Sequence, residues 1–127
     1  MSDRRSPIFI VEDEPIIQLM IEHSLKECGC NNLHMFSDGA TAVEESLLLE
    51  PEIIFMDIML AGQMDGVEAA YEIRNHSNAV IIFMSANSDL LESDPRLEYI
   101  KPLRILNKPK GMQDITFLVN ELLRKAA

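Results

Sequence analysis

The sequence predicts an α/β fold in which helices cover both faces of a parallel sheet. Short apolar runs alternate along the chain with longer segments, most of which have helical spacing of their apolar residues. The runs IIFM and VIIFM show no polar alternation, which is typical of strands buried on both faces. The length of 127 residues suits one domain of ordinary size. These observations predict a single layered domain.

Five apolar runs are expected to form the strands. They are PIFIV (7–11), NLHMF (32–36), EIIFM (52–56), AVIIFM (79–84) and PLRIL (102–106). A longer segment follows each run, so we expect five strand and helix pairs. Parallel neighbouring strands need such crossover connections.

Two of the longer segments have a clear helical period. After the first strand, apolar residues at steps of three and four mark one buried face, namely Ile17, Met20, Ile21, Leu25 and Cys28. Gly29 stands where a C-terminal cap is expected. The last segment repeats the period with Ile115, Leu118, Val119, Leu122 and Leu123. Between Ser88 and Lys101, in contrast, Pro95 and the following Pro102 permit only short helical pieces.

Composition and charge argue against several classes of protein. The formal net charge of −10 disfavours direct binding to nucleic acid or to an anionic membrane. No apolar run approaches the roughly 18 residues of a membrane-spanning helix, and the start MSDRRSP lacks the apolar core of a signal peptide. A cytoplasmic location is therefore expected. Cys28 and Cys30, spaced C-G-C, are expected to be reduced thiols.

Polar residues are predicted to gather at the carboxyl ends of the strands, where open α/β sheets bind ligands. They are Glu12, Asp13, Glu14, Asp57, Ser85 and Lys108. Taken singly, most have a structural explanation: an acid before Pro15 can begin a helix, a serine can cap one, and lysines are usually exposed. Asp57 differs because it interrupts the apolar run IIFMDIML, where an unpaired carboxylate is costly to bury. Their joint placement indicates one site.

Together these residues resemble the receiver domain of two-component response regulators, essentially along the whole chain. The motifs that match are the acidic pair in IFIVEDE, Asp57 in IIFMDIML, Asp65-Gly66, Ser85-Ala86 in IIFMSA, and Lys108-Pro109. The resemblance implies a flavodoxin-like, doubly wound, five-stranded sheet with strand order 2-1-3-4-5. A single receiver domain over residues 1–127 with no output domain is expected, because the last predicted helix ends at the chain end.

The resemblance further implies a phosphoacceptor site. Asp57 would take a phosphoryl group from a sensor histidine kinase or a histidine phosphotransfer protein, in a Mg²⁺-dependent step. The metal ligands implied are Glu12, Asp13, Asp57 and the backbone carbonyl of Met59. Lys108 would stabilise the developing negative charge, and Ser85 would hydrogen-bond the phosphoryl group. Three converging carboxylates repel by about 4 kcal/mol per pair at roughly 4 Å and an effective dielectric of about 20, which also points to a cation.

The implied activity is limited to self-phosphorylation and autodephosphorylation, so no enzyme acting on other substrates is expected. The phosphorylated form would act on a downstream protein target, and a homodimer would form through the fourth helix, the fifth strand and the fifth helix. The main alternative is a receiver-like interaction module that works without phosphorylation. A flavodoxin-type electron carrier is disfavoured because its first loop would offer Ser, Thr and Gly instead of E-D-E. A haloacid dehalogenase-type phosphatase would have a second aspartate at the position of Met59.

Three departures from the receiver pattern lie on the output side. The loop between Asp57 and Asp65 is one residue longer than usual and has Ala61 where proline is common, which predicts a freer loop. Ile105 replaces the usual aromatic residue, so an aromatic switch is not expected. The proline-broken segment from Ser88 to Lys101 predicts an unusual fourth helix and partner surface.

Overall fold

The computed structural model describes residues 5–86, 89–108 and 110–126. Five parallel strands form one sheet in the order β2-β1-β3-β4-β5, which confirms the predicted order. The strands are β1 (Ile8–Val11), β2 (Leu33–Phe36), β3 (Ile53–Asp57), β4 (Val80–Ser85) and β5 (Arg104–Asn107). β3 and β4 each run one residue further than the apolar pattern predicted. Asp57 and Ser85 therefore belong to the strands themselves, which fixes their backbones in the sheet.

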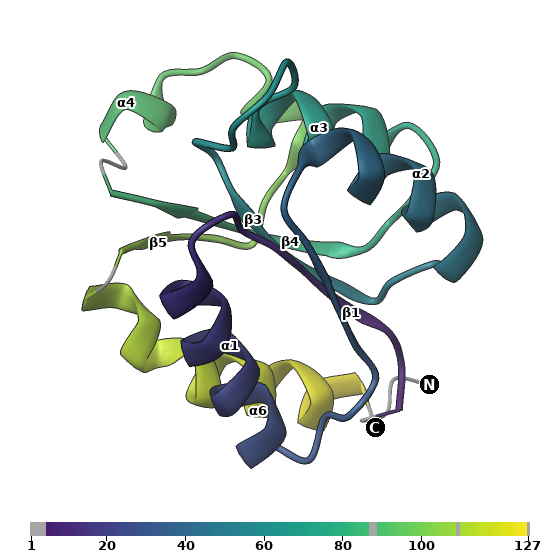
Figure 1. Cartoon of the computed structure of the whole chain (residues 1–127), viewed down its shortest axis with the longest axis vertical. Helices are drawn as coiled ribbons and strands as arrows, with labels where there is room; N and C mark the ends of the chain where they lie inside the picture. Colours follow the sequence, from purple (N-terminus) through teal and green to yellow (C-terminus); the bar gives the residue numbers. More distant parts are fainter. Residues whose placement is uncertain (1–4, 87–88, 109, 127) are drawn as a thin grey trace.

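Helices cover both faces of the sheet (Figure 1). They are α1 (Pro15–Glu27), α2 (Gly39–Leu49), α3 (Gly66–Arg74), α4 (Asp89–Glu92), α5 (Leu97–Ile100) and α6 (Ile115–Ala126), with a 3₁₀ helix η1 (Lys110–Asp114) before α6. One face is packed by α1 and α6, and the other by α2, α3 and α5. This is the doubly wound arrangement that the sequence predicts.

Alternate residues of a strand enter two different cores. In β1, Ile8 and Ile10 pack in the core under α1 and α6, whereas Phe9 and Val11 pack in the core under α2 and α3. Phe9, Phe55 and Phe83, all from strands, are the largest of the fully buried side chains. Because both faces are buried, apolar residues occupy consecutive positions, which explains the absence of polar alternation.

The ends of α1 agree with the predicted helix signals in part. Gly29 has φ 83°, and its N–H donates to the carbonyl of Lys26 while the N–H of Cys30 donates to that of Leu25. These two bonds form a Schellman cap. At the other end Glu14 is the N-cap residue and Pro15 begins the helix, but the Glu14 side chain makes no capping bond. The Glu14 carboxylate instead accepts a hydrogen bond from Lys108.

The fourth helix is replaced by two short helices, as the prolines predicted. α4 and α5 each contain four residues. Arg74 of α3 fastens the end of α5, because its Nε donates to the carbonyl of Ile100 at 2.7 Å and its guanidinium also donates to that of Ala79 at 2.7 Å. The hydroxyl of Tyr99 donates to Asn75 Oδ1 at 2.6 Å. α5 is thus tied to α3; Ser88, at the predicted start of the segment, lies outside the described residues.

Cys28 and Cys30 are buried and no disulfide joins them, which agrees with the predicted reduced thiols. Within the described residues, every helix is too short or too polar to cross a membrane.

Gly66, the glycine of the Asp65-Gly66 pair, packs directly against the end of β3. A Cβ added there would lie 2.7 Å from the carbonyl carbon of Asp57 and 2.8 Å from Cα of Ile58. Because these are backbone atoms, the strand end that carries Asp57 would have to move. We expect Gly66→Ala to lower the free energy of unfolding by about 3 kcal/mol, measured by urea titration.

The matched control for this change is Gly111→Ala, where the nearest atom to an added Cβ is a side-chain carbon at 3.4 Å. It should change stability by less than about 1 kcal/mol. Equal stability of the two variants would show that the backbone at Gly66 has room to adjust.

Candidate functional site

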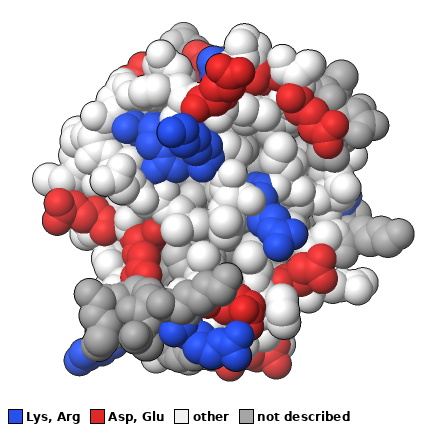
Figure 2. Space-filling model, turned by 180° about the vertical axis from the view of Figure 1, so that it is seen from behind, with Lys and Arg blue, Asp and Glu red and all other residues white. Residues whose placement is uncertain are grey.

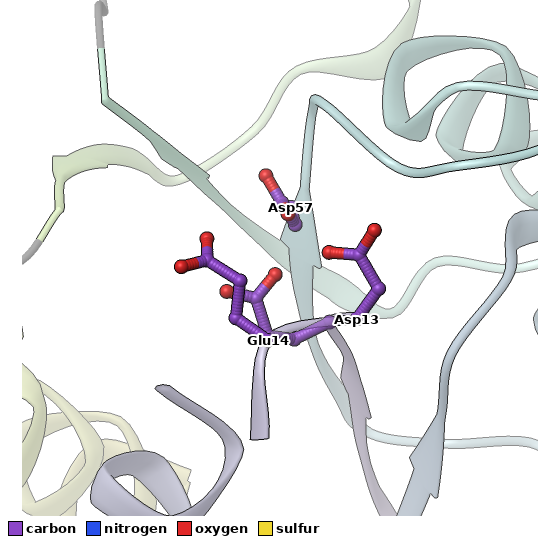
Figure 3. Close-up of side chains that lie close together, drawn as sticks. Asp13, Glu14 and Asp57 are labelled. Atoms are coloured by element: carbon purple, nitrogen blue, oxygen red, sulfur yellow. The ribbon is translucent and has the colours of Figure 1, made fainter. Parts of the chain in front are cut away.

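Four carboxylates meet at the carboxyl end of the sheet, where β1 and β3 lie side by side. Val11 of β1 pairs with Met56 of β3, so Glu12 emerges beside Asp57. Glu12, Asp13, Glu14 and Asp57 each offer an oxygen, and these oxygens lie within 4.8 Å of one another. In Figure 3 the side chains of Asp13 and Glu14, from the loop after β1, face Asp57 at the end of β3. The adjacency of the two strands creates this cluster.

The four acids differ sharply in burial. Glu12 and Asp57 are buried, Asp13 is half-buried and Glu14 is exposed. Oε2 of Glu12 is a buried oxygen with no hydrogen-bond partner in the described part of the chain. A buried carboxylate oxygen without a donor is costly unless a cation or an ordered water meets it. This orphaned oxygen and the surrounding acids fit a hard divalent cation such as Mg²⁺.

Lys108 supplies the positive charge within the cluster. Its Nζ lies 2.7 Å from Oε1 of Glu12, 2.8 Å from Oε1 of Glu14 and 3.2 Å from Oδ2 of Asp57. Its backbone N–H donates to the carbonyl of Ser85 at 2.8 Å, which positions the residue just beyond β5. Burial alone would lower the pKa of Lys108, but hydrogen bonds to Glu12 and Glu14 and the charge of Asp57 raise it above its ordinary value. Lys108 therefore remains protonated.

A single lysine does not neutralise the buried acids. Burial and the nearby carboxylate of Asp57 raise the pKa of Glu12 to about 8, and Lys108 offsets only part of this rise. Without a metal ion, Glu12 therefore keeps its proton at neutral pH, which removes one negative charge from the site.

The raised pKa of Glu12 predicts a pH dependence of stability without metal. The folded protein binds this proton more tightly than the unfolded chain does, so the stability from Glu12 is complete below pH 4.5 and is lost as pH rises toward about 8. We expect Glu12→Gln, which is neutral throughout, to remove this decline. Urea unfolding in EDTA across this range, for both proteins, measures the difference. Parallel stability curves would contradict the assignment.

The loop after β3 is fastened to two of the acids. The N–H of Met59 donates to Oδ1 of Asp57 at 3.0 Å, and the N–H of Ala61 donates to Oδ2 of Asp13 at 3.2 Å. Proline has no N–H and could not make the second bond. The departure at Ala61 therefore ties the longer loop to the acidic cluster, which limits the freedom predicted for it.

A cavity of about 300 Å³ opens at the cluster. It is lined by Glu14, Ile17, Asp57, Met59, Ala86 and Lys108. Ser85 is buried at the end of β4, and Ala86 after it borders the cavity. The structure thus brings together the predicted residues Glu12, Asp13, Asp57 and Lys108, with Met59 and Ser85 beside them, while Pro109 lies outside the described residues.

Glu14 is the strand-end residue to which sequence reasoning assigned no role in the site. The acid before Pro15 matched a helix start, and that local explanation accounted for it. Its contact with Lys108 joins residues 94 positions apart. A third consecutive acid in IFIVEDE was the available signal, because a helix start needs only one.

The fold is that of a receiver domain, and comparison with known proteins identifies the family. Residues 8–120 match the response regulator receiver domain. The chain belongs to this family, and so is a receiver domain of two-component signalling.

Among its relatives is the transcriptional regulatory protein PdtaR of Mycobacterium tuberculosis, 32% identical over 110 residues that cover 85% of this chain and 52% of PdtaR. A protein-glutamate methylesterase/protein-glutamine glutaminase of Archaeoglobus fulgidus is 26% identical, over 93% of this chain and 34% of that protein. The chain thus spans about half the length of PdtaR and a third of the methylesterase. The expected absence of an output domain stays a prediction.

Solved structures agree with this assignment. The signal receiver domain of a modulated diguanylate cyclase from Desulfovibrio desulfuricans has a TM-score of 0.76 at 28% identity, covering 97% of this chain and 99% of that one. The receiver domain of a sensor histidine kinase from Pseudomonas aeruginosa has a TM-score of 0.77 at 27% identity, covering 94% and 98%, and holds a magnesium ion in its active site cleft. Receiver domains bind Mg²⁺ at an acidic cluster of this kind.

Proposed function

We propose that this receiver domain accepts a phosphoryl group on Asp57 from a phosphohistidine of a histidine kinase or a histidine phosphotransfer protein. The observation that supports this most directly is the position of Asp57, which is held in a strand, borders an open cavity and has Oδ2 3.2 Å from the Nζ of Lys108. A nucleophile and a fixed positive charge face the same space.

Several residues of the chain have distinct roles in the proposed phosphoryl transfer. A carboxylate oxygen of Asp57 attacks the phosphorus atom, and the bond from phosphorus to the histidine nitrogen breaks with its electron pair left on the ring. The N–H of Met59 holds Oδ1 of Asp57 at 3.0 Å and so orients the nucleophile. Lys108 stabilises negative charge that develops on the phosphoryl oxygens. Ser85 hydrogen-bonds the product in this proposal, which makes the end of β4 responsive to phosphorylation.

Glu12, Asp13, Asp57 and the backbone carbonyl of Met59 would hold Mg²⁺. Bound there, the ion neutralises excess carboxylate charge and polarises a phosphoryl oxygen. We expect the melting temperature to rise when about 10 mM Mg²⁺ is added, because the ion binds only the folded site. The rise should be smaller in Asp13→Asn. An unchanged melting temperature in the unmodified protein would argue against metal binding.

Receiver domains interact with histidine kinases and downstream effectors. For this chain we propose a downstream protein target, reached through the surface of α4, α5, β5 and α6, and a homodimer through the same surface. Direct binding of nucleic acid is not proposed, because the net charge is −10 and the Lys and Arg side chains on the face in Figure 2 form separate groups among uncharged and acidic residues. A cytoplasmic location fits this role.

Intact mass after incubation with acetyl phosphate tests the proposal. We expect the gain of one phosphoryl group with Mg²⁺ and little gain without it. No gain in either condition would favour the alternative, an interaction module that works without phosphorylation. Turnover of a generic phosphatase substrate is not expected, because the proposed activity is limited to the domain's own phosphorylation and dephosphorylation.

A further inference from the structure

The ammonium group of Lys108 is fully occupied in this structure. An ammonium group has three N–H donors. Glu12 and Glu14 accept from Nζ at 2.7 and 2.8 Å, and Oδ2 of Asp57 lies 3.2 Å away. The side chain of Lys108 is only 8% exposed, so little water reaches it. A phosphoryl oxygen that binds Lys108 must therefore take the place of one of these three carboxylates.

The solvent exposure of each carboxylate determines which one can give up its contact with Lys108. The side chain of Glu12 is 0% exposed, so it would lose its lysine without gaining water. Asp57 carries the phosphoryl group and stays at the site. The side chain of Glu14 is 61% exposed and can exchange the lysine for solvent. Because Glu14 makes no capping bond to α1, its departure leaves the helix start unchanged.

We propose that Glu14 competes with the phosphoryl group for Lys108 and thereby slows phosphorylation of Asp57. This inference rests on the proposed phosphoacceptor function and assigns to it a contact that lowers the rate of phosphorylation. Glu14, Asp57 and Lys108 border the same cavity of about 300 Å³, so the carboxylate of Glu14 lies where an anionic donor enters. The carboxylate both occupies a donor of Lys108 and repels the incoming phosphoryl oxygens. Glu14 acts through its contact with Lys108 and takes no part in the chemical step itself.

The test compares Glu14→Gln with Glu27→Gln. Glu27 is an acid on the same helix whose side chain is 59% exposed, and it contacts His23 away from the site. The two variants therefore have the same net charge and similar exposure at the substituted position. Glu14→Ala serves as a second variant, because alanine cannot hydrogen-bond Lys108. The rate of phosphorylation by acetyl phosphate is followed by intact mass at saturating Mg²⁺.

We expect Glu14→Gln and Glu14→Ala to be phosphorylated about two- to five-fold faster than the unmodified protein, as suits an exposed ion pair. Glu27→Gln should keep the original rate. Affinity for beryllofluoride, a phosphoryl mimic, should rise by a similar factor in both Glu14 variants, which a purely structural role would not produce.

The outcomes separate this inference from the proposed function. If the unmodified protein gains no phosphoryl group, the proposed function fails and this inference fails with it. If the unmodified protein is phosphorylated but the Glu14 variants react at the same rate or more slowly, only the competition is overturned. A slower Glu14→Gln would mean instead that Glu14 holds Lys108 in its productive position.

Discussion

Asp57→Asn is expected to abolish the gain of a phosphoryl group from acetyl phosphate while leaving the domain folded. The asparagine amide lacks the nucleophilic carboxylate but keeps an oxygen that can accept from the N–H of Met59. It also removes one of four acids whose oxygens lie within 4.8 Å of one another. We therefore expect the metal-free variant to unfold at the same urea concentration as the unmodified protein, or at a higher one.

Asp114→Asn is the control for this experiment, because Asp114 is an exposed aspartate in η1, outside the acidic cluster. It should gain the phosphoryl group at the original rate. A phosphoryl gain in Asp57→Asn with unchanged kinetics would show that another residue is the acceptor.

Lys108→Met should produce the largest loss of stability among the changes considered. It leaves Glu12 and Asp57, both buried, without the cation that contacts them at 2.7 and 3.2 Å. Removing one partner of a buried ion pair costs about 3–5 kcal/mol. We expect a fall of this size in the free energy of unfolding by urea titration without metal, and Mg²⁺ should restore part of it. Phosphorylation should also slow strongly, because the fixed charge facing the phosphoryl group is lost.

Lys26→Met is the matched control, since Lys26 pairs with Glu22 at 3.4 Å on the surface of α1 and its side chain is 59% exposed. It should cost less than about 1 kcal/mol. If the two lysine variants were equally stable, the role of Lys108 in balancing the charge of the buried carboxylates would be wrong.

Local sequence patterns were sufficient to predict the elements of the fold. Each of the five apolar runs became a strand, because an uninterrupted apolar run can be buried on both faces only inside a covered sheet. Gly29 ended α1 as predicted, because glycine readily adopts positive φ. Pro95 predicted the division of the fourth helix, which the structure confirms. These signals act between residues that are close in the chain.

The site was predictable as a set of residues but not as a set of contacts. Strand ends in a parallel α/β sheet share one edge, so Asp57 and Lys108 could be placed there from their motifs. Their partners depend on strand adjacency and side-chain direction. The hydrogen bond from Arg74 to the end of α5 likewise depends on tertiary structure, because it joins residues 26 positions apart. No local pattern specifies a side-chain bond to a distant backbone carbonyl.

Glu14 shows most clearly what the tertiary structure alone decided. Beside Pro15 its sequence context indicates a helix start, and the helix does start there. Its carboxylate nevertheless turns to Lys108, 94 residues away, because burial of that lysine beside Glu12 and Asp57 creates a stronger electrostatic partner than the free N–H groups of α1. The sequence by itself determined which residues stand at the strand ends. Only the tertiary structure determined which of them contact the ammonium group of Lys108, because burial sets the strength of each charge interaction.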